Sequence, residues 1–162
     1  MGHSGESIVS SAFQFERLAP ASAGYASLPV DAAFNWAECA SPAATGEWYM
    51  VAFRSVMRPS ADEDRLREYD DRAYEEARTA PGFVHYFKGP ANDLGQCLSF
   101  CLWDSRQLAR SAAGRPAHLD ALGIAHATYE RYTLEFFRVR KRGGWLTFEF
   151  EPYDRPDADA AA

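Results

Sequence analysis

Hydrophobic and polar positions change their spacing several times along the chain, and each change marks an expected element. Residues 47–57 are a run of aromatic and β-branched side chains without a breaker, which predicts a strand buried on both faces. Residues 60–79 place apolar side chains on one helical face, with Ser60 expected as the N-cap and Glu63 completing a capping box. The turn at 80–82 ends this helix.

The same alternation of elements continues to the end of the chain. Short apolar runs predict strands at 83–89 and 97–103, and Asp104 is expected to cap a second helix. That helix breaks near Gly114, and a further helix runs from Pro116 to about residue 128. The last expected strands are 129–141 and, after a Gly-Gly turn, an additional C-terminal strand within 144–153. This order is that of a ferredoxin-like split βαβ fold of the α+β class.

Three regions divide the chain. Residues 1–46 form an N-terminal arm rich in Ala, Ser, Pro and Gly that also carries several aromatic side chains. Because exposed apolar surface costs about 25 cal/mol per Å², we expect the arm to pack on its own core or on a neighbouring subunit. Residues 47–141 form the ferredoxin-like domain. We expect residues 142–162 to supply the extra strand and a disordered tail.

Composition narrows the classes of protein. The 162 residues carry a net charge of -6 and contain 47% hydrophobic residues, enough for one domain with a packed core. We expect no membrane span and no nucleic-acid partner, because apolar runs are short and basic residues are scattered. The N-terminus lacks the pattern of a signal peptide, so we expect a cytoplasmic protein with its three cysteines free.

Cys97 and Cys101 raise the question of a metal site. On a helix they would lie one turn apart and share a metal. On the expected strand they lie about 13 Å apart, too far for a disulfide or a shared zinc ion. The strand assignment therefore predicts no metal site here.

Strand alternation divides residues 97–103 between two faces of the sheet. One face carries Leu98, Phe100 and Leu102, which we expect to pack under the helices. The other face carries small, weakly polar side chains that suit the wall of a ligand cavity or, alternatively, a tight dimer interface. Its members are Cys97, Ser99, Cys101 and Trp103.

The stretches APGF (80–83) and LWDSRQLARSAAGRPAH (102–118) resemble the antibiotic biosynthesis monooxygenase family of dimeric α+β barrels. The resemblance covers roughly residues 47–141. It implies a homodimer in which each sheet carries helices on one face and lends the other to a shared barrel, where ligands lie. It also implies oxygenase chemistry. Some members of the family oxidise phenolic or polyketide-like substrates without a cofactor, and others degrade haem.

In the haem-degrading members of that family, an Asn on the first strand, a Trp on the helix after the third strand and a later His carry the reaction. Aligned on the corner at Trp103, these three positions hold Phe53, Ala112 and Ala121. None of them matches. We therefore expect no cofactor, and a haem-binding variant that uses His118 ranks third among the hypotheses.

His85 is the candidate catalytic base, because an imidazole among aromatic side chains titrates near neutral pH. A cofactor-free oxygenase needs such a base to form an electron-rich phenolate that reacts with O2. Alternation puts His85 on one face with Phe83 and Phe87, and Val84 and Tyr86 on the other. The alternative is a buried histidine that serves only packing and hydrogen bonding.

Two hypotheses of different class follow. The first is a small oxygenase-like enzyme that acts on an aromatic or hydrophobic small molecule in the barrel cavity. Its expected cavity residues are Tyr49, Phe53, Ser99, Cys101, Trp103 and His118. The second is a non-catalytic ligand-binding or dimeric assembly protein whose barrel is filled by side chains. No nucleotide-binding or classical hydrolase motif occurs.

Overall fold

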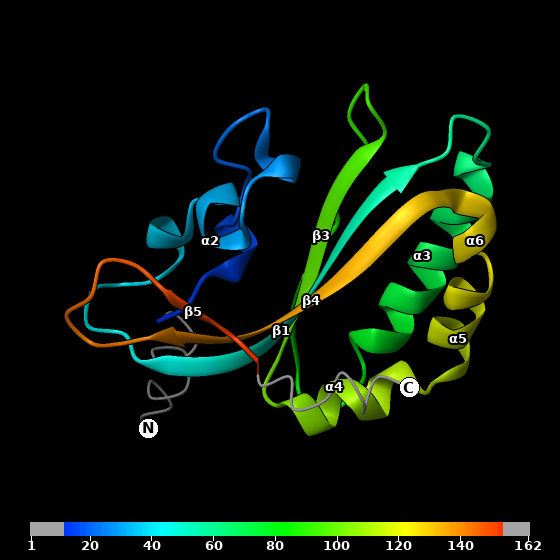
Figure 1. Cartoon of the computed structure of the whole chain (residues 1–162). Helices are drawn as coiled ribbons and strands as arrows, with labels where there is room; N and C mark the ends of the chain where they lie inside the picture. The colour runs from blue at the N-terminus through cyan, green and yellow to red at the C-terminus, as the bar shows by residue number, and fades with distance from the viewer. Residues whose placement is uncertain (1–11, 154–162) are drawn as a thin grey trace, which may run out of the picture.

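Five antiparallel strands form the central sheet of the computed structural model, which describes residues 12–153 (Figure 1). The strands are β1 (Gly46–Met57), β2 (Phe83–Phe87), β3 (Gln96–Trp103), β4 (Tyr129–Lys141) and β5 (Glu149–Pro152). Their order in the sheet is β2-β3-β1-β4-β5. The first four strands have the ferredoxin-like arrangement, which confirms the predicted α+β class, and β5 extends the sheet at the edge of β4.

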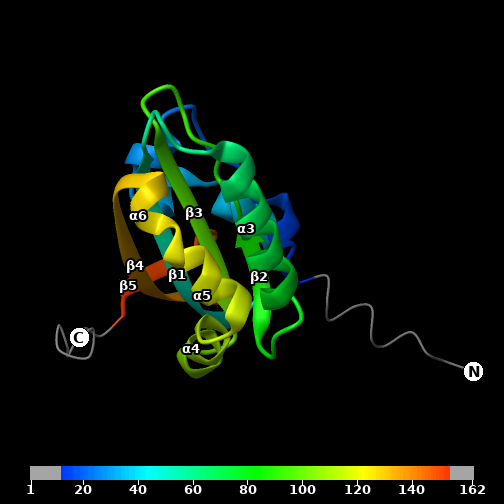
Figure 2. The same ribbon diagram turned by 90° about the vertical axis from the view of Figure 1, so that its right-hand side faces the viewer.

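A layer of helices covers one face of this sheet (Figure 2). The helices are α3 (Glu63–Ala77), α4 (Arg106–Ala113), α5 (Pro116–Gly123) and α6 (Ala125–Thr128). Glu76 holds α3 against α5, because its carboxylate accepts the backbone N–H groups of Ala117 and His118 at 3.1 and 3.3 Å. These two hydrogen bonds also satisfy two of the free backbone N–H donors at the start of α5.

Both predicted N-caps are wrong, by two residues for α3 and by one residue for α4. Asp62, not Ser60, caps α3 and accepts the backbone N–H of Arg65 at 3.0 Å. Ser105, not Asp104, caps α4 and accepts the N–H of Leu108 at 3.2 Å. Several short oxygen-bearing side chains stand together at each helix start, and the sequence pattern alone does not select among them.

The N-terminal arm covers the opposite face of the sheet. Its short helical turns are η1 (Phe15–Arg17), η2 (Tyr25–Ser27), α2 (Val30–Ala33) and η3 (Trp36–Cys39). Trp36 contacts Phe100 of β3 with ring centroids 5.5 Å apart, and its indole N–H donates to the carbonyl of Val30 at 2.9 Å. Arg54 of β1 donates to the arm carbonyl of Ala26 at 2.7 Å. The structure therefore shows the arm packed on the core of its own chain, which is one of the two locations expected.

This arrangement corrects the predicted environment of β3. Leu98, Phe100 and Leu102 are fully buried under the arm and do not pack under the helices. Alternation correctly separated the two faces of the strand but gave no information on which layer covers which face. The aromatic arm takes the larger and more apolar face, because burying that surface stabilises the fold most.

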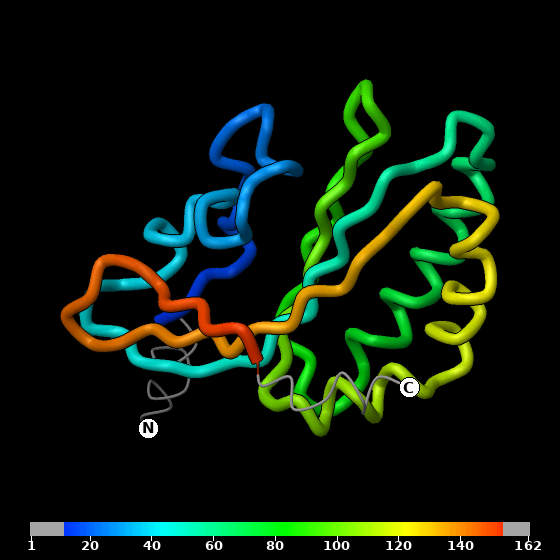
Figure 3. The backbone as a smooth tube through the Cα atoms, in the orientation of Figure 1, coloured from blue at the N-terminus to red at the C-terminus, as the bar shows by residue number. Residues whose placement is uncertain are grey.

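The arm also occupies the face that the family resemblance assigns to a second subunit. The long strands β1 and β4 bend together, and their ends at Gly46 and Lys141 lie with β5 on the arm side of the molecule (Figure 3). Lys141 is almost completely buried there and donates to the carbonyls of Pro42, Ala44 and Arg142. A homodimer formed through this face would require the arm to leave it.

Candidate functional site

The face of the sheet that points toward the helices is the less closed of its two faces. We call it the helix-side face. Its residues include Tyr49, Val51, Phe53, Tyr86, Ser99, Cys101, Trp103, Tyr132 and Phe136. Most of them are half-buried, whereas Met50, Ala52 and Phe100 on the opposite, arm-side face are fully buried. Neither α3 nor α5 has a fully buried residue. The helical layer therefore covers this face less tightly than the arm covers the other face.

Strand pairing brings five of the predicted cavity residues together on the helix-side face. Tyr49 pairs with Trp103, and Phe53 pairs with Ser99, across β1 and β3. Cys101 lies between Ser99 and Trp103 on the same face. The sixth, His118, lies on α5 and is half-buried. Burial lowers the pKa of His118, and the nearby Glu76 carboxylate opposes this shift.

His85 does not share this face. It pairs with Leu102 on the arm side, where its ring lies 6.3 Å from Phe15 and 6.2 Å from Phe100. A bulge between Phe83 and His85 breaks the alternation, so Phe83 pairs with Trp103 on the helix side and the prediction that it shares a face with His85 is wrong. Burial lowers the pKa of His85, which favours a neutral imidazole.

Tyr86 is a site residue that the sequence reasoning missed. It pairs with Cys101 on the helix-side face, and its hydroxyl interacts with the Ser99 hydroxyl. Burial, reinforced by the negative charge of Asp70, raises the pKa of Tyr86 well above its usual value. Tyr86 therefore stays a hydrogen-bond donor at any physiological pH. Alternation correctly placed Tyr86 on the face opposite His85, but the sequence did not show that this face points toward the helices.

Asp70 is the carboxylate whose charge raises the pKa of this phenol. It projects from α3, and its Oδ2 lies 3.5 Å from the Nζ of Lys88. Burial raises the pKa of Asp70, whereas the Lys88 ammonium lowers it. Its charge also raises the pKa of Tyr129, where burial is the larger cause. A partly desolvated carboxylate thus faces two phenols across the space between helix and sheet.

Aromatic rings extend the surface around this group. Phe53 lies 5.1 Å from Tyr129 and 5.4 Å from Tyr132, measured between ring centroids. Tyr74 of α3 approaches Tyr86 at 5.6 Å from the other side. These rings offer flat apolar contacts, and the hydroxyl groups of the tyrosines can form hydrogen bonds with the oxygens of a planar ligand.

Cys101 contributes a thiol and not a nucleophile. The indole N–H of Trp103 donates to its Sγ at 3.1 Å, and the Sγ lies 3.8 Å from the carbonyl oxygen of Val51. Burial raises the pKa of Cys101 to about 11, so the thiolate is scarce at neutral pH.

Cys97 lies on the same strand. Within residues 12–153, no group of three or more His, Cys, Asp or Glu side chains is placed to hold a metal ion.

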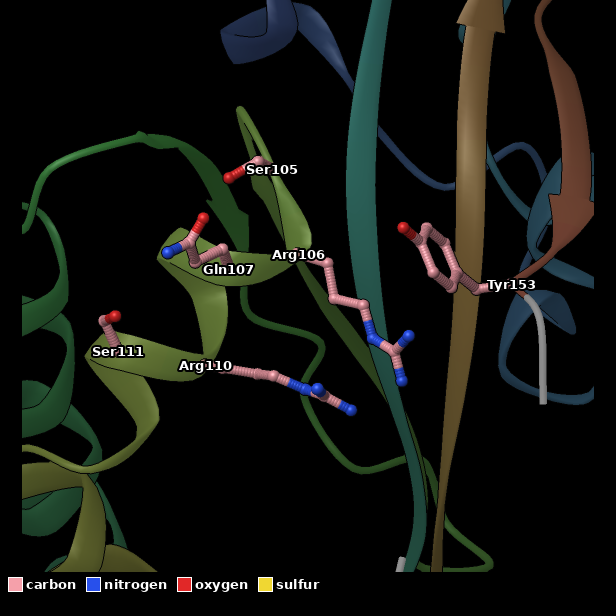
Figure 4. A pocket seen from close by; sticks show the side chains of 6 residues that line it. All are labelled: Ser105, Arg106, Gln107, Arg110, Ser111 and Tyr153. Atoms are coloured by element: carbon pink, nitrogen blue, oxygen red, sulfur yellow. The ribbon is translucent and has the colours of Figure 1, made fainter. Parts of the chain in front are cut away.

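A separate pocket lies beside the start of α4 (Figure 4). It has a volume of about 620 Å³ and is lined by Ser105, Arg106, Gln107, Arg110, Ser111 and Tyr153. The Tyr153 ring lies 5.1 Å from that of Tyr49, so the pocket adjoins one end of the helix-side face. None of its lining residues was a candidate from the sequence, because surface arginines on a helix are ordinarily solvated side chains.

Comparison with known families places the chain. A family model described as PB2B2.08-like matches residues 6–152. The chain belongs to the PB2B2.08-like family. The UPF0643 protein PB2B2.08 of Schizosaccharomyces pombe is 28% identical over 109 residues, which cover 64% of this chain and 50% of the yeast protein. The chain thus matches about half the length of this PB2B2.08 relative.

Solved structures share the fold of this PB2B2.08-like chain. A protein from Shewanella oneidensis has a TM-score of 0.52 at 8% identity and covers 59% of this chain and 93% of its own. A protein from Nitrosomonas europaea, provisionally named an antibiotic biosynthesis monooxygenase, has a TM-score of 0.50 at 13% identity, covering 56% and 88%. The fold is therefore of the antibiotic biosynthesis monooxygenase type, and at these identities the likeness shows the fold alone.

The match to the PB2B2.08-like family covers more of the chain than the solved structures do. The family model includes most of the arm and β5, because it spans residues 6–152. The shares covered by the two structures are instead close to that of residues 46–141. Of the helices in residues 12–153, none is long and apolar enough to cross a bilayer.

Proposed function

We propose that the chain is a small oxygenase-like enzyme that acts, without a cofactor, on an aromatic and hydrophobic small molecule bound at the helix-side face. One observation carries the proposal: the sheet is sealed on its arm side but half-open and aromatic on its helix side. Binding sites for small molecules are commonly apolar surfaces with a few placed polar groups. Tyr86, Ser99 and Asp70 are those groups here.

The arrangement suits a polycyclic phenol. The rings of Phe53, Tyr129 and Tyr132 contact its flat face, and Tyr86 donates a hydrogen bond to one of its oxygens. The resemblance to the monooxygenase family supports this class of ligand, and fold alone does not establish it.

Asp70 takes the role of base in this proposal, in place of His85. It lies between α3 and the sheet close to Tyr86, whereas His85 lies on the sealed face. Asp70 accepts the proton of the bound phenol. A ring carbon of the phenolate then bonds to one oxygen atom of O2, and the O–O bond breaks as water leaves. The product is a quinone, and all four electrons that reduce O2 come from the ring.

Oxygen consumption with a panel of polycyclic phenols and anthrones tests the proposal. Asp70→Asn should lower the rate by about 10²-fold or more, the range expected for loss of a general base. Asp64→Asn is the matched control, because Asp64 is an exposed carboxylate on the same helix and does not act on the pKa of Asp70. His85→Gln should leave the rate within about twofold. Normal turnover in folded Asp70→Asn protein, with loss in His85→Gln, would return the base to His85 and overturn this assignment.

A ligand-binding protein without catalysis is the second candidate. Its supporting observation is that burial keeps both Tyr86 and the Cys101 thiol protonated, so neither is an activated nucleophile. In that case the same phenols bind at the helix-side face, and no oxygen is consumed above the rate in buffer.

A further inference from the structure

We propose that the pocket at the start of α4 binds the oxyanion of a ligand, a carboxylate or a phosphate, whose aromatic body lies against Tyr153 and Phe136. The site is independent of the proposed reaction, which uses residues at the middle of the helix-side face. Three observations support the proposal: a converging arginine pair, an unpaired buried donor and an adjoining aromatic wall.

Arg106 and Arg110 extend from consecutive turns of α4, and both guanidinium groups reach toward the same side of the pocket (Figure 4). Two like charges spaced four residues apart on a helix repel each other. A bound anion between them removes that repulsion. Arginine suits this purpose because its planar fork of N–H donors matches the geometry of a carboxylate or phosphate.

Neither arginine is neutralised within the described residues. Among residues 12–153, neither Arg106 nor Arg110 forms an ion pair with a carboxylate, whereas Arg138 approaches Glu47 at 3.5 Å. The Nε of Arg106 is buried and has no hydrogen-bond partner in that part of the chain. Buried donors are almost always satisfied, so this atom indicates a missing acceptor.

Tyr153 fixes the position of the Arg106 charge. The guanidinium carbon of Arg106 lies 4.8 Å from the centre of the Tyr153 ring, and that of Arg138 lies 5.2 Å away. Such cation–π contacts hold a guanidinium in place without using up its N–H donors. The contact with Tyr153 therefore leaves the guanidinium N–H groups of Arg106 available to oxygen acceptors at this end of the helix-side face, where the Tyr49 hydroxyl also lies.

An aromatic wall continues from the pocket onto the sheet. The Tyr49 ring lies edge-on to Tyr153 at 5.1 Å and stacks with Phe136 at 6.3 Å. Phe136 is 42% exposed, although it points to the same face as the buried Tyr49. Because this aromatic wall adjoins the arginine pair, we infer a ligand that joins an anionic group to an aromatic ring.

Isothermal titration of the full chain tests the site with 2-naphthoate, phenyl phosphate, inorganic phosphate and the neutral 2-naphthamide. We expect one of the two aromatic anions to bind at least about tenfold more tightly than the amide, since charge-assisted hydrogen bonds are lost in the amide. The relative affinity of naphthoate and phenyl phosphate then identifies the anionic group. Equal affinities for the amide and both anions would overturn the proposal.

Substitutions locate the binding. Arg110→Gln and the double variant Arg106→Gln, Arg110→Gln should each weaken anion binding about tenfold or more, and Arg67→Gln on the exposed side of α3 should not. Thermal melting without ligand checks that the variants fold, and Arg110→Gln alone serves if the double variant does not. Asp70→Asn should retain anion binding even where it loses turnover, so failure of the proposed reaction and failure of this site are distinguishable. Unchanged anion binding in folded Arg110→Gln protein would contradict the assignment.

Discussion

At the scale of single residues, three groups on β2 and β3 differ because of the layer that covers them. Tyr86 and Cys101 face the helices and are held as neutral donors, whereas His85 faces the arm and is held as a neutral imidazole. In each case burial is the largest cause of the pKa shift. The chemistry of these groups therefore depends on the face more than on the residue type.

His85 should make the fold sensitive to acid. Its folded-state pKa lies below the ordinary value of 6.5, so the unfolded chain takes up a proton more readily as the pH falls. The stability that His85 contributes is present above pH 6.5 and is lost below it. His85→Phe should therefore reduce the loss of stability between pH 8 and pH 5, measured by urea unfolding. The exposed His126→Gln is the control, and an unchanged loss in His85→Phe would contradict the pKa assignment.

At the scale of elements, the sequence predicted the order of strands and helices correctly because each change of period is local. It did not predict the bulge in β2, since the extra residue has no signature in a run of five strand residues. That bulge decides the face of Phe83 and leaves Tyr86 beside Cys101. The predicted cavity residues on β1 and β3 share the helix-side face, whereas the predicted base on β2, His85, lies on the arm-side face.

The sequence predicts an aromatic arm but not its location, because the apolar side chains of short turns do not indicate which surface they pack against. Phe34 and Trp36 pack on Phe100 with ring centroids 5.0 and 5.5 Å apart. The arm is therefore a part of the core and not an appendage.

Truncation of an arm aromatic should accordingly destabilise the whole fold. Trp36→Ala removes a buried ring and its hydrogen bond to Val30, and we expect a loss of about 3–5 kcal/mol in the free energy of unfolding. The control is Trp145→Ala, because Trp145 is 46% exposed in the turn before β5 and should cost less than about 1 kcal/mol. Urea unfolding followed by circular dichroism measures both. Equal small losses would show that the arm is not part of the cooperative unit.

At the scale of the whole molecule, the arm determines which face of the sheet is covered by the chain itself. The family resemblance implies a homodimer through the face opposite the helices, and here residues of the same chain bury that face. The helix-side face is consequently the large sheet surface that remains accessible to a ligand.

Light scattering coupled to size-exclusion chromatography should show a monomer at micromolar concentration. The reason is that, within the described residues, the arm buries the sheet face through which barrel-type pairing would occur. The control is Trp36→Ala under conditions where it remains folded, in which a loosened arm should raise the share of larger species. A stable dimer of the unaltered chain that forms through the arm-side face would refute this prediction.

The central claim is that ligands bind on the helix side of the sheet and not on the arm side. Two-dimensional NMR of the labelled chain during titration with a polycyclic phenol tests it most directly. We expect shift changes at Phe53, Tyr86 and Ser99, with little change at Phe15, Trp36 and His85. Changes concentrated at Phe15, Trp36 and His85, with Phe53 and Tyr86 unaffected, would contradict it.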